Sequence, residues 1–389
     1  MTAVSINTTV SSLSSPSSPG RYPTVDPVVA GAILTIDLGA IRENYRRLKV
    51  RLGNAACAGV VKADAYGLGA VPVARALRKE GCDTFFVAHV NEGVVLREAL
   101  GSGPVIAVLN GVPPGAEESC IDASLLPVIN SADQLAAWRD TARRNGRALK
   151  AVLQVDSGMS RLGLSPAEVE AIAADPGALE GIETVLVMSH LACADEPDHA
   201  ANRAQLEEFR RLRKMLPAAP ASLANSSGIF LGADWHFDLA RPGAALYGIN
   251  PTPIAAQNPM RPVVRLDAKV IQTREIVAGA GVGYGHTYVA SHALRTATIS
   301  LGYADGWHRR NTAAAYFDGV RLPFLGRVSM DSIILDISAL PAGRLKAGDM
   351  VELIGPSQDV DHAAVGAGTI GYEVLTSLGH RFHRHYLEG

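Results

Sequence analysis

"IETVLVMSHLA", residues 182–192, is almost unbroken in apolarity and ends next to a serine and a histidine. The earlier segment "LKAVLQVDSG", residues 149–158, has the same character. Runs of this kind are typical of parallel strands that are buried on both faces. Because amphipathic sequence follows each of them, this part of the chain is predicted to consist of strand–helix units.

The same alternation extends from residue 33 to about residue 260. Two helix starts are marked by a capping-box pattern, Ser131 with Gln134 and Ser165 with Glu168. Repeated βα units predict either a doubly wound sheet or an eight-stranded barrel. No GxGxxG motif follows the first strand, and the candidate polar residues come directly after strands. We therefore expect an α/β fold with an N-terminal (β/α)8, TIM-like barrel.

Beyond residue 260 the pattern changes to strand-like segments that are separated by turns containing glycine and proline, such as "VRLPFLGRVSMDSIILDISAL" at 320–340. This predicts a mostly β C-terminal domain at 261–389, after a barrel domain at 31–260. Residues 1–30 are rich in Ser, Thr and Pro and lack the basic and apolar regions of a signal peptide. They are predicted to form a disordered tail.

Composition limits the possible partners. The 389 residues are 48% hydrophobic and 19% charged, with a formal net charge of −2, so no general attraction to nucleic acid or to an anionic membrane is expected. No apolar run is long enough to span a bilayer. The four cysteines match no zinc spacing, which favours free thiols and a cytoplasmic protein that holds no metal.

Several polar residues follow successive predicted strands, where barrels place their active sites. They are Lys62 with Tyr66, Arg161, His190, Asn225 with Ser226, and Arg241. Each has an ordinary structural explanation when taken alone, such as a hydrogen-bonded core histidine or a surface arginine. Together, an amine beside apolar residues and glycine-rich donors suit an anionic cofactor that carries an aldehyde, which suggests phosphopyridoxyl chemistry.

The sequence then resembles the alanine racemase family, and the resemblance covers the chain from about 33 to 387. It starts at "VVKADAYGLG" (60–69), which is similar to the cofactor-attachment signature of that family. The further matching motifs follow in order: "DSGMSRLG" (156–163), "SHLACADE" (189–196), "NSSG" (225–228), "RPGAALYG" (241–248), "VGYGHTY" (282–288), "LGYADGW" (301–307), "GRVSMD" (326–331) and "GYEVLTSLGHR" (371–381).

The resemblance implies that Lys62 holds pyridoxal 5′-phosphate covalently and serves as one proton-transfer base. Tyr284, contributed by the second subunit of a homodimer, would be the opposing base. Removing and returning a proton on opposite faces of Cα needs two such groups. The resemblance implies that the phosphate is held by Tyr66, Ser226, Tyr372 and the backbone of Gly243 and Ala244.

The other site residues that the resemblance implies surround the cofactor ring and the substrate. Arg241 would hydrogen-bond the pyridine nitrogen and, as a donor-only cation, leave it unprotonated. His190 would lie against the ring, and Arg161 would reach the phenolic oxygen and the tyrosine base. The substrate pocket would be bordered by Met330 and Asp331 at the carboxylate, both from the partner subunit, and narrowed by Tyr303 at its entrance.

One departure from the family pattern concerns Gln154, which stands where many members carry a carbamylated lysine that steadies the equivalent of Arg161. Glutamine cannot be carbamylated. We therefore expect either a bound chloride-like anion near Arg161 or a direct hydrogen bond from the Gln154 amide to it.

The resulting prediction is an alanine racemase that interconverts L- and D-alanine and supplies D-alanine for peptidoglycan. One alternative is a broader or serine-preferring racemase, since a methyl group and a hydroxymethyl group are only modestly discriminated by a small pocket. A related decarboxylase of basic amino acids or diaminopimelate would be expected to carry a catalytic cysteine and an acidic ring partner in place of Arg241. A cofactor-carrying barrel protein without enzymatic activity would lack the second domain.

Overall fold

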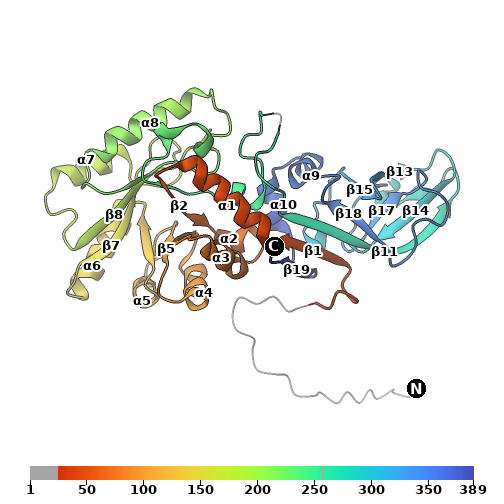
Figure 1. The fold of residues 1–389 in the computed structure, drawn as a ribbon, viewed down its shortest axis with the longest axis horizontal. Coiled ribbons are helices and arrows are strands. Elements are labelled where there is room, and N and C mark those ends of the chain that lie inside the picture. Colours follow the sequence, from red (N-terminus) through yellow and green to blue (C-terminus); the bar gives the residue numbers. More distant parts are fainter. Residues whose placement is uncertain (1–24, 256) are drawn as a thin grey trace, which may run out of the picture.

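The computed structural model describes residues 25–255 and 257–389. It consists of a barrel-shaped body, at the left of Figure 1, and a second body rich in strands at the right. Helices α1 and α2, helix α10 and strands β1 and β19 lie where the two bodies meet. The predicted N-terminal tail falls mainly on residues 1–24, which lie outside the described residues.

The barrel body is organised around seven parallel strands in the order β3-β4-β5-β6-β7-β8-β9. Their bounds are β3 (Gly59–Val60), β4 (Thr84–Val87), β5 (Val105–Val108), β6 (Leu126–Ile129), β7 (Leu149–Gln154), β8 (Ile182–Met188) and β9 (Ala221–Ser222). Their in-order parallel pairing is that of a barrel, whereas a doubly wound sheet reverses its strand order at a switch point.

Strand β10 (Leu239–Ala240) closes the ring by pairing in parallel with β2 (Ala56–Cys57), which runs directly into β3. The Asp238 N–H donates to the Ala221 carbonyl at 3.0 Å, and the Val60 N–H donates to the Pro242 carbonyl at 3.0 Å. With β2 and β3 taken as two parts of one strand, the seven strands and β10 form the eight-stranded barrel. The predicted fold class is confirmed.

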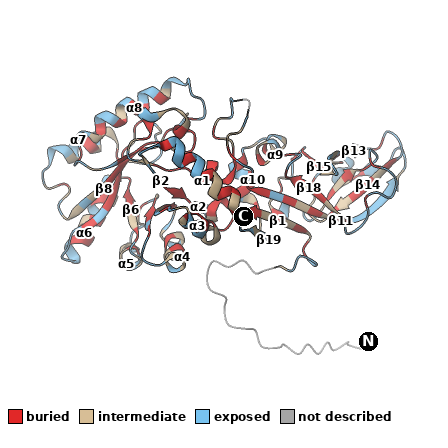
Figure 2. Cartoon of the chain, in the orientation of Figure 1, coloured by how far each residue is buried: buried red, intermediate tan, exposed pale blue. Residues whose placement is uncertain are grey.

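Helices cover the outside of the barrel, and in Figure 2 their outer faces are exposed and their inner faces are buried. They are α1 (Leu38–Leu52), α3 (Ala70–Lys79), α4 (Val90–Leu100), α5 (Glu117–Asp122), α6 (Ala132–Arg144), α7 (Pro166–Ala174) and α8 (Ala200–Arg213). The short helix α2 (Lys62–Tyr66) directly follows β3 at the carboxyl end of that strand. The predicted capping box is complete at Ser165 and Glu168. At α6 the Ser131 hydroxyl accepts from the Gln134 N–H as expected, but the Gln134 side chain accepts from Asn130 instead of Ser131.

The second body contains an eight-stranded, mainly antiparallel sheet, which confirms a mostly β C-terminal domain. Its strands are β1 (Ala32–Asp37), β11 (Val264–Ile276), β14 (Leu294–Ile299), β15 (Ala314–Phe317), β16 (Val320–Pro323), β17 (Ile333–Asp336), β18 (Met350–Ile354) and β19 (His383–Leu387). A small hairpin of β12 (Gly281–Val282) and β13 (Tyr288–Val289), and the helices α9 (Val360–Ala367) and α10 (Gly371–Ser377), complete it.

Strand β1 lies in this second sheet, although it precedes the barrel strands in the sequence. It pairs antiparallel with β11 and parallel with β19, so both ends of the described chain meet there. The domain limits near residues 30 and 260 stay predictions. No helix within the described ranges combines the length and apolarity needed to cross a bilayer.

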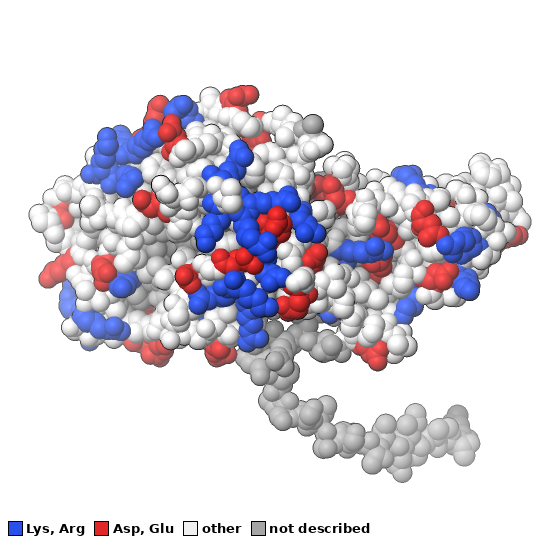
Figure 3. Space-filling view, viewed as in Figure 1, with Lys and Arg blue, Asp and Glu red and all other residues white. Residues whose placement is uncertain are grey.

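Charged side chains of both signs are interspersed on the face shown in Figure 3. Around α1 and the C-terminus they form ion pairs, including Arg46 with Glu80 at 2.8 Å and Lys79 with Glu388 at 2.7 Å. Exposed pairs of this kind contribute little stability individually. Lys and Arg gather over the middle of this face, around α1, with a few Asp and Glu side chains among them (Figure 3).

Candidate active site

The candidate lysine is the first residue of an unusual turn. Helix α2 is left-handed, because Ala63, Asp64 and Ala65 have φ values of 52°, 52° and 54° and Tyr66 has a φ of 57°. Hydrogen bonds from the Ala65 N–H to the Val61 carbonyl (2.9 Å) and from the Gly67 N–H to the Ala63 carbonyl (2.8 Å) close it. L-residues adopt this conformation at a cost of about 1–2 kcal/mol each. The surroundings must therefore stabilise the turn.

That stabilisation comes from both bodies. From the barrel, the Glu92 carboxylate accepts from the Ala63 N–H at 2.8 Å. From strand β19, Arg384 donates to the Gly67 carbonyl at 2.7 Å and the Tyr386 hydroxyl donates to the Leu68 carbonyl at 2.9 Å. Sequence reasoning missed all three side chains, because they are far from Lys62 in the sequence. For Glu92 the sequence did offer one indication, because a glutamate at the third position of a helix often accepts from backbone N–H groups near the start of that helix.

The turn ends at a glycine that the packing requires. Gly67 has a φ of 80°, and a Cβ atom there would lie 2.6 Å from the Leu375 carbonyl oxygen of α10. A side chain would therefore be strained by its backbone conformation and would clash with α10. The lysine turn thus packs directly against the second body.

The electrostatic environment favours a reactive lysine. Burial, and then the nearby Arg161 guanidinium, lower the pKa of Lys62, while the Glu92 carboxylate acts in the opposite direction. A lower pKa raises the fraction of neutral, nucleophilic amine at physiological pH.

A set of N–H and hydroxyl groups converges beside Tyr66. The Ser226 hydroxyl oxygen accepts from the backbone N–H groups of Gly243 and Ala245, both at 3.1 Å. A Cβ atom on Gly243 would lie 2.4 Å from the Tyr66 hydroxyl, so only glycine allows this approach. The Tyr372 ring lies 5.9 Å from the Tyr66 ring. Burial raises the pKa of both hydroxyls, that of Tyr372 to about 12, so both remain protonated donors.

Arg241, a buried cation, and His190, which is partly buried, lie at the same end of the barrel. Arg241 is 4% exposed and donates to the Ser189 carbonyl at 2.6 Å and to the Ser222 hydroxyl. Burial lowers the pKa of Arg241 to about 10, which leaves it cationic at neutral pH. Burial and then the Arg241 charge lower the pKa of His190 to about 3, so His190 is neutral.

The Gln154 prediction is partly corrected. Gln154 is 6% exposed, and its amide nitrogen donates to the Leu162 carbonyl at 3.2 Å. No hydrogen bond joins it to Arg161 within the described part of the chain, so the expected direct bond is wrong. The amide reaches the backbone next to Arg161 because that loop folds back over the end of β7. The alternative, an anion beside Arg161, stays a prediction.

Of the predicted site residues in the second body, Tyr372 lies beside Tyr66, whereas Tyr284, Tyr303, Met330 and Asp331 lie away from the Lys62 group. Tyr284 is 67% exposed in a turn between β12 and β13, at the end of the molecule remote from α2 (Figure 1). Met330 and Tyr303 are also exposed, and Asp331 pairs with Arg381 at 2.7 Å. Among the described residues, none of the four side chains hydrogen-bonds to the Lys62 group. A single chain therefore brings together the barrel residues of the predicted site and Tyr372 of α10, and leaves these four residues outside.

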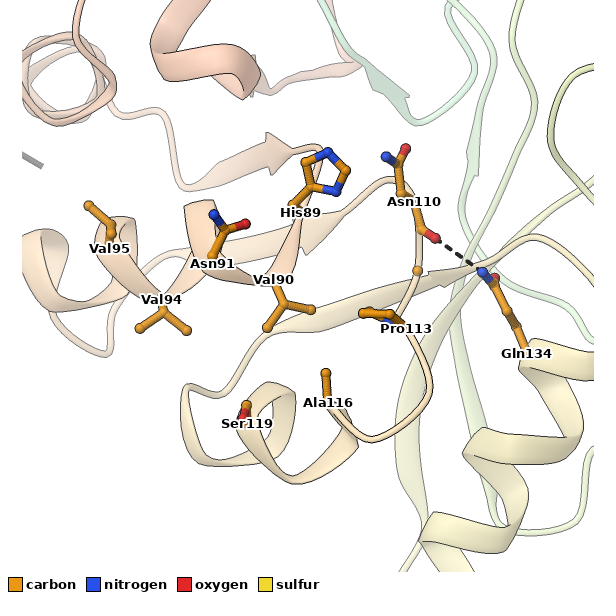
Figure 4. A pocket seen from close by; sticks show the side chains of 11 residues that line it. His89, Val90, Asn91, Val94, Val95, Asn110, Pro113, Ala116, Ser119 and Gln134 are labelled. Carbon is orange, nitrogen blue, oxygen red and sulfur yellow. Dashed lines mark hydrogen bonds between the residues drawn. The ribbon is translucent and has the colours of Figure 1, made fainter. Parts of the chain in front are cut away.

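A separate cavity of about 780 Å³ lies between α4 and α5, also near the carboxyl ends of the strands (Figure 4). It is lined by His89, Val90, Asn91, Val94, Val95, Asn110, Gly111, Pro113, Ala116, Ser119 and Gln134. None of the predicted site residues lines it. Figure 4 also shows the Gln134 amide donating to the Asn110 carbonyl, at 3.1 Å.

The chain is similar to known proteins over nearly its whole length. Residues 36–251 match the family model "Alanine racemase, N-terminal domain", and residues 263–386 match "Alanine racemase, C-terminal domain". A catabolic alanine racemase of Mesorhizobium japonicum is 68% identical over 365 residues, which are 94% of this chain and 96% of that protein. One of Agrobacterium fabrum, also named catabolic, is 54% identical over 361 residues, 92% of this chain and 93% of that protein.

A solved structure shows the same fold over nearly the whole length. The alanine racemase of Bartonella henselae, a crystal structure with covalently bound pyridoxal phosphate, is 43% identical and superposes with a TM-score of 0.89. The superposition covers 92% of this chain and 100% of that chain.

Proposed function

Because the chain belongs to the alanine racemase family, we propose that it is a pyridoxal-phosphate-dependent isomerase that interconverts L-alanine and D-alanine, with Lys62 as the cofactor-binding residue and one of two bases. The main structural support for this function is the environment of Lys62. Its amine lies beside Arg161 in a partly buried site, at the end of the barrel where the Ser226 hydroxyl accepts from the Gly243 N–H.

The residues present fit the cofactor. A phosphate needs several N–H or hydroxyl donors and close backbone approach, which the serine, the two protonated tyrosines and the Cβ-free Gly243 supply. The residues that would hold the phosphate are Tyr66, Ser226, Tyr372 and the backbone of Gly243 and Ala244. When bound, the cofactor supplies an electron-withdrawing ring that acidifies the α-hydrogen of an attached amino acid.

Two groups, buried Arg241 and partly buried His190, suit the cofactor ring. Arg241 is a cation with donors only, and it already uses two of them on the Ser189 carbonyl and the Ser222 hydroxyl, which hold its plane. It would present a remaining N–H to the pyridine nitrogen and keep that nitrogen unprotonated. Neutral His190 would lie against the ring without adding a positive charge to it.

Racemisation needs a second base on the face of Cα opposite Lys62. Within one chain Tyr284 is remote from α2 and exposed, so we propose that it acts in a second copy's site. Met330 and Asp331 would border the substrate carboxylate from the same side, with Tyr303 at the entrance. The pairing of Asp331 with Arg381, which also binds Asp305, would keep this loop in place.

The experiment that tests the reaction is solvent-deuterium incorporation at Cα of each alanine enantiomer. Wild-type protein should exchange and interconvert both enantiomers. Tyr284→Phe should keep the cofactor absorbance and exchange one enantiomer while losing interconversion. If wild-type protein binds the cofactor and interconverts serine much faster than alanine, the substrate assignment fails and the serine-preferring alternative takes its place.

The cellular role of the enzyme is either D-alanine supply or alanine catabolism. D-alanine supply for peptidoglycan is the simplest expectation, but the names of the two relatives given above favour a catabolic role. Induction of this protein by alanine, together with poor growth of a deletion strain on alanine as sole carbon source, would support catabolism. A deletion strain that needs D-alanine to grow in any medium would support peptidoglycan supply.

A further inference from the structure

In three barrel helices, the side chain of the third residue forms a hydrogen bond with the backbone of a neighbouring segment. In each, this side chain bonds to the backbone that directly follows the carboxyl end of the neighbouring, earlier barrel strand. In α6, the Gln134 amide donates to the Asn110 carbonyl at 3.1 Å (Figure 4). In α7, the Glu168 carboxylate accepts from the Ala132 N–H at 2.9 Å, and in α4, Glu92 accepts from the Ala63 N–H at 2.8 Å. These bonds tie neighbouring loops together around the mouth of the barrel.

Glu92 is the member of this set that reaches the lysine turn. Its second carboxylate oxygen accepts from the N–H groups of Ala88 and His89, at 2.6 Å and 3.2 Å. One oxygen is therefore fixed to the end of β4 and the start of α4, while the other holds the backbone next to Lys62. All three bonds need an acceptor, which a carboxylate provides at both oxygens.

The bond to Ala63 controls the direction of the lysine side chain. The Ala63 N–H belongs to the peptide unit that follows Lys62, so fixing it fixes the backbone on one side of the Lys62 Cα. The Val61 carbonyl belongs to the peptide unit on the other side and accepts from Ala65 at 2.9 Å. With both units held, the Cα–Cβ bond of Lys62 has one direction. Without these hydrogen bonds, the strained left-handed backbone that follows Lys62 would relax toward ordinary negative φ values.

We propose that Glu92 is a positioning residue for Lys62: it aims the amine at the cofactor aldehyde by holding the Ala63 N–H. This inference rests on the proposed function, since it concerns attachment of pyridoxal 5′-phosphate at Lys62. In that step the neutral amine adds to the aldehyde carbon, a C=N bond forms and water leaves. Both the aim of the amine and its protonation state therefore set the rate.

The carboxylate also acts through its charge, and the two effects can be separated. Two charged groups act on the Lys62 amine: the Arg161 guanidinium lowers its pKa and the Glu92 carboxylate raises it, while His190, neutral beside them, adds no charge. Loss of the negative charge moves the pH midpoint of attachment lower. Loss of the hydrogen bond lowers the limiting rate at high pH, where the amine is neutral.

Three variants of the full-length protein test this after removal of the cofactor. Glu92→Gln loses the charge and one acceptor, and Glu92→Asp keeps the charge but is one methylene shorter. Glu168→Gln is the matched control, because Glu168 caps α7 and reaches Ala132 with the same bond pattern without touching the lysine turn. Pyridoxal 5′-phosphate is added at a series of pH values. The adduct is then trapped with borohydride and quantified on the Lys62 peptide by mass spectrometry.

We expect the limiting rate of attachment to fall about tenfold or more in both Glu92 variants, as for loss of one orienting hydrogen bond. The pH midpoint should shift lower in Glu92→Gln only, and Glu168→Gln should match wild type in both respects. Equal limiting rates in all four proteins would overturn the inference while leaving the proposed function standing. A wild-type protein that forms no adduct at Lys62 would overturn both. The Glu92→Asp variant keeps the test valid if the amide variant misfolds.

Discussion

The hydroxyl of Tyr386 donates a 2.9 Å hydrogen bond to the carbonyl of Leu68, six residues beyond Lys62. Tyr386 lies in β19, the last strand of the chain, which pairs with β1 in the second body. The end of the chain therefore forms a tie between the C-terminal sheet and the lysine turn. Arg384, on the same strand, adds a second tie at the Gly67 carbonyl.

Tyr386→Phe should destabilise the protein by about 1 kcal/mol, because the Leu68 carbonyl loses its partner in a partly buried setting. Urea unfolding followed by circular dichroism measures the change. Tyr316→Phe is the control, since the Tyr316 hydroxyl makes no hydrogen bond within the described residues. Equal midpoints for the two variants would show that the bond to Leu68 contributes nothing to stability.

Gly67→Ala should cost about 1–3 kcal/mol of unfolding free energy, since the new Cβ meets the Leu375 carbonyl and the backbone is left-handed. Gly319→Ala separates the two causes. Gly319 has a φ of 77°, close to the 80° of Gly67, but a Cβ there has open space around it. Gly67→Ala should therefore be the more destabilising of the two in thermal unfolding, and a loss equal to that of Gly319→Ala would rule out the clash.

Mixing two inactive variants tests whether the site is shared between copies. Lys62→Ala lacks the cofactor-binding amine and Tyr284→Phe lacks the second base. If Tyr284 acts in trans, subunit exchange creates mixed dimers with one intact site, and racemase activity should recover to about a quarter of the wild-type value. Native mass spectrometry confirms that exchange has occurred, because the mixed dimer has a mass between those of the two homodimers. A mixture that stays inactive although mixed dimers form would place both bases in one chain.

His190 should make the cofactor-free protein sensitive to mild acid. Its folded-state pKa, about 3, lies below the ordinary value of 6.5, so between these values the unfolded chain binds the extra proton. The His190 contribution is complete above pH 6.5 and is lost as pH falls toward 3, at up to about 1.4 kcal/mol per pH unit. Urea unfolding measures how far the unfolding free energy falls between pH 7 and pH 5. This fall should be smaller in His190→Asn than in wild-type protein, by up to about 2 kcal/mol. Identical losses in both proteins would contradict a neutral buried histidine.

Much of the barrel could be predicted because its signals are local. The unbroken apolarity of β7 and β8, the cap at Ser165 and the placement of His190 after a strand depend only on near neighbours. The conformation of the lysine turn could not be predicted in this way. "KADAY" contains no glycine, and the left-handed φ values of Ala63 to Tyr66 contradict the intrinsic preference of every residue in it.

The fold class and the polar side chains at the strand ends near Lys62 follow from local patterns, because periodicity, caps and strand ends depend on residues that are close in the sequence. How Lys62 is held follows from long-range contacts. Glu92, Arg384 and Tyr386 come from 30 to more than 300 residues away, and their hydrogen bonds offset a backbone strain that no local pattern reveals. The tertiary structure also decided that β1 joins the second sheet, since strand pairing depends on which edges the folded chain leaves free.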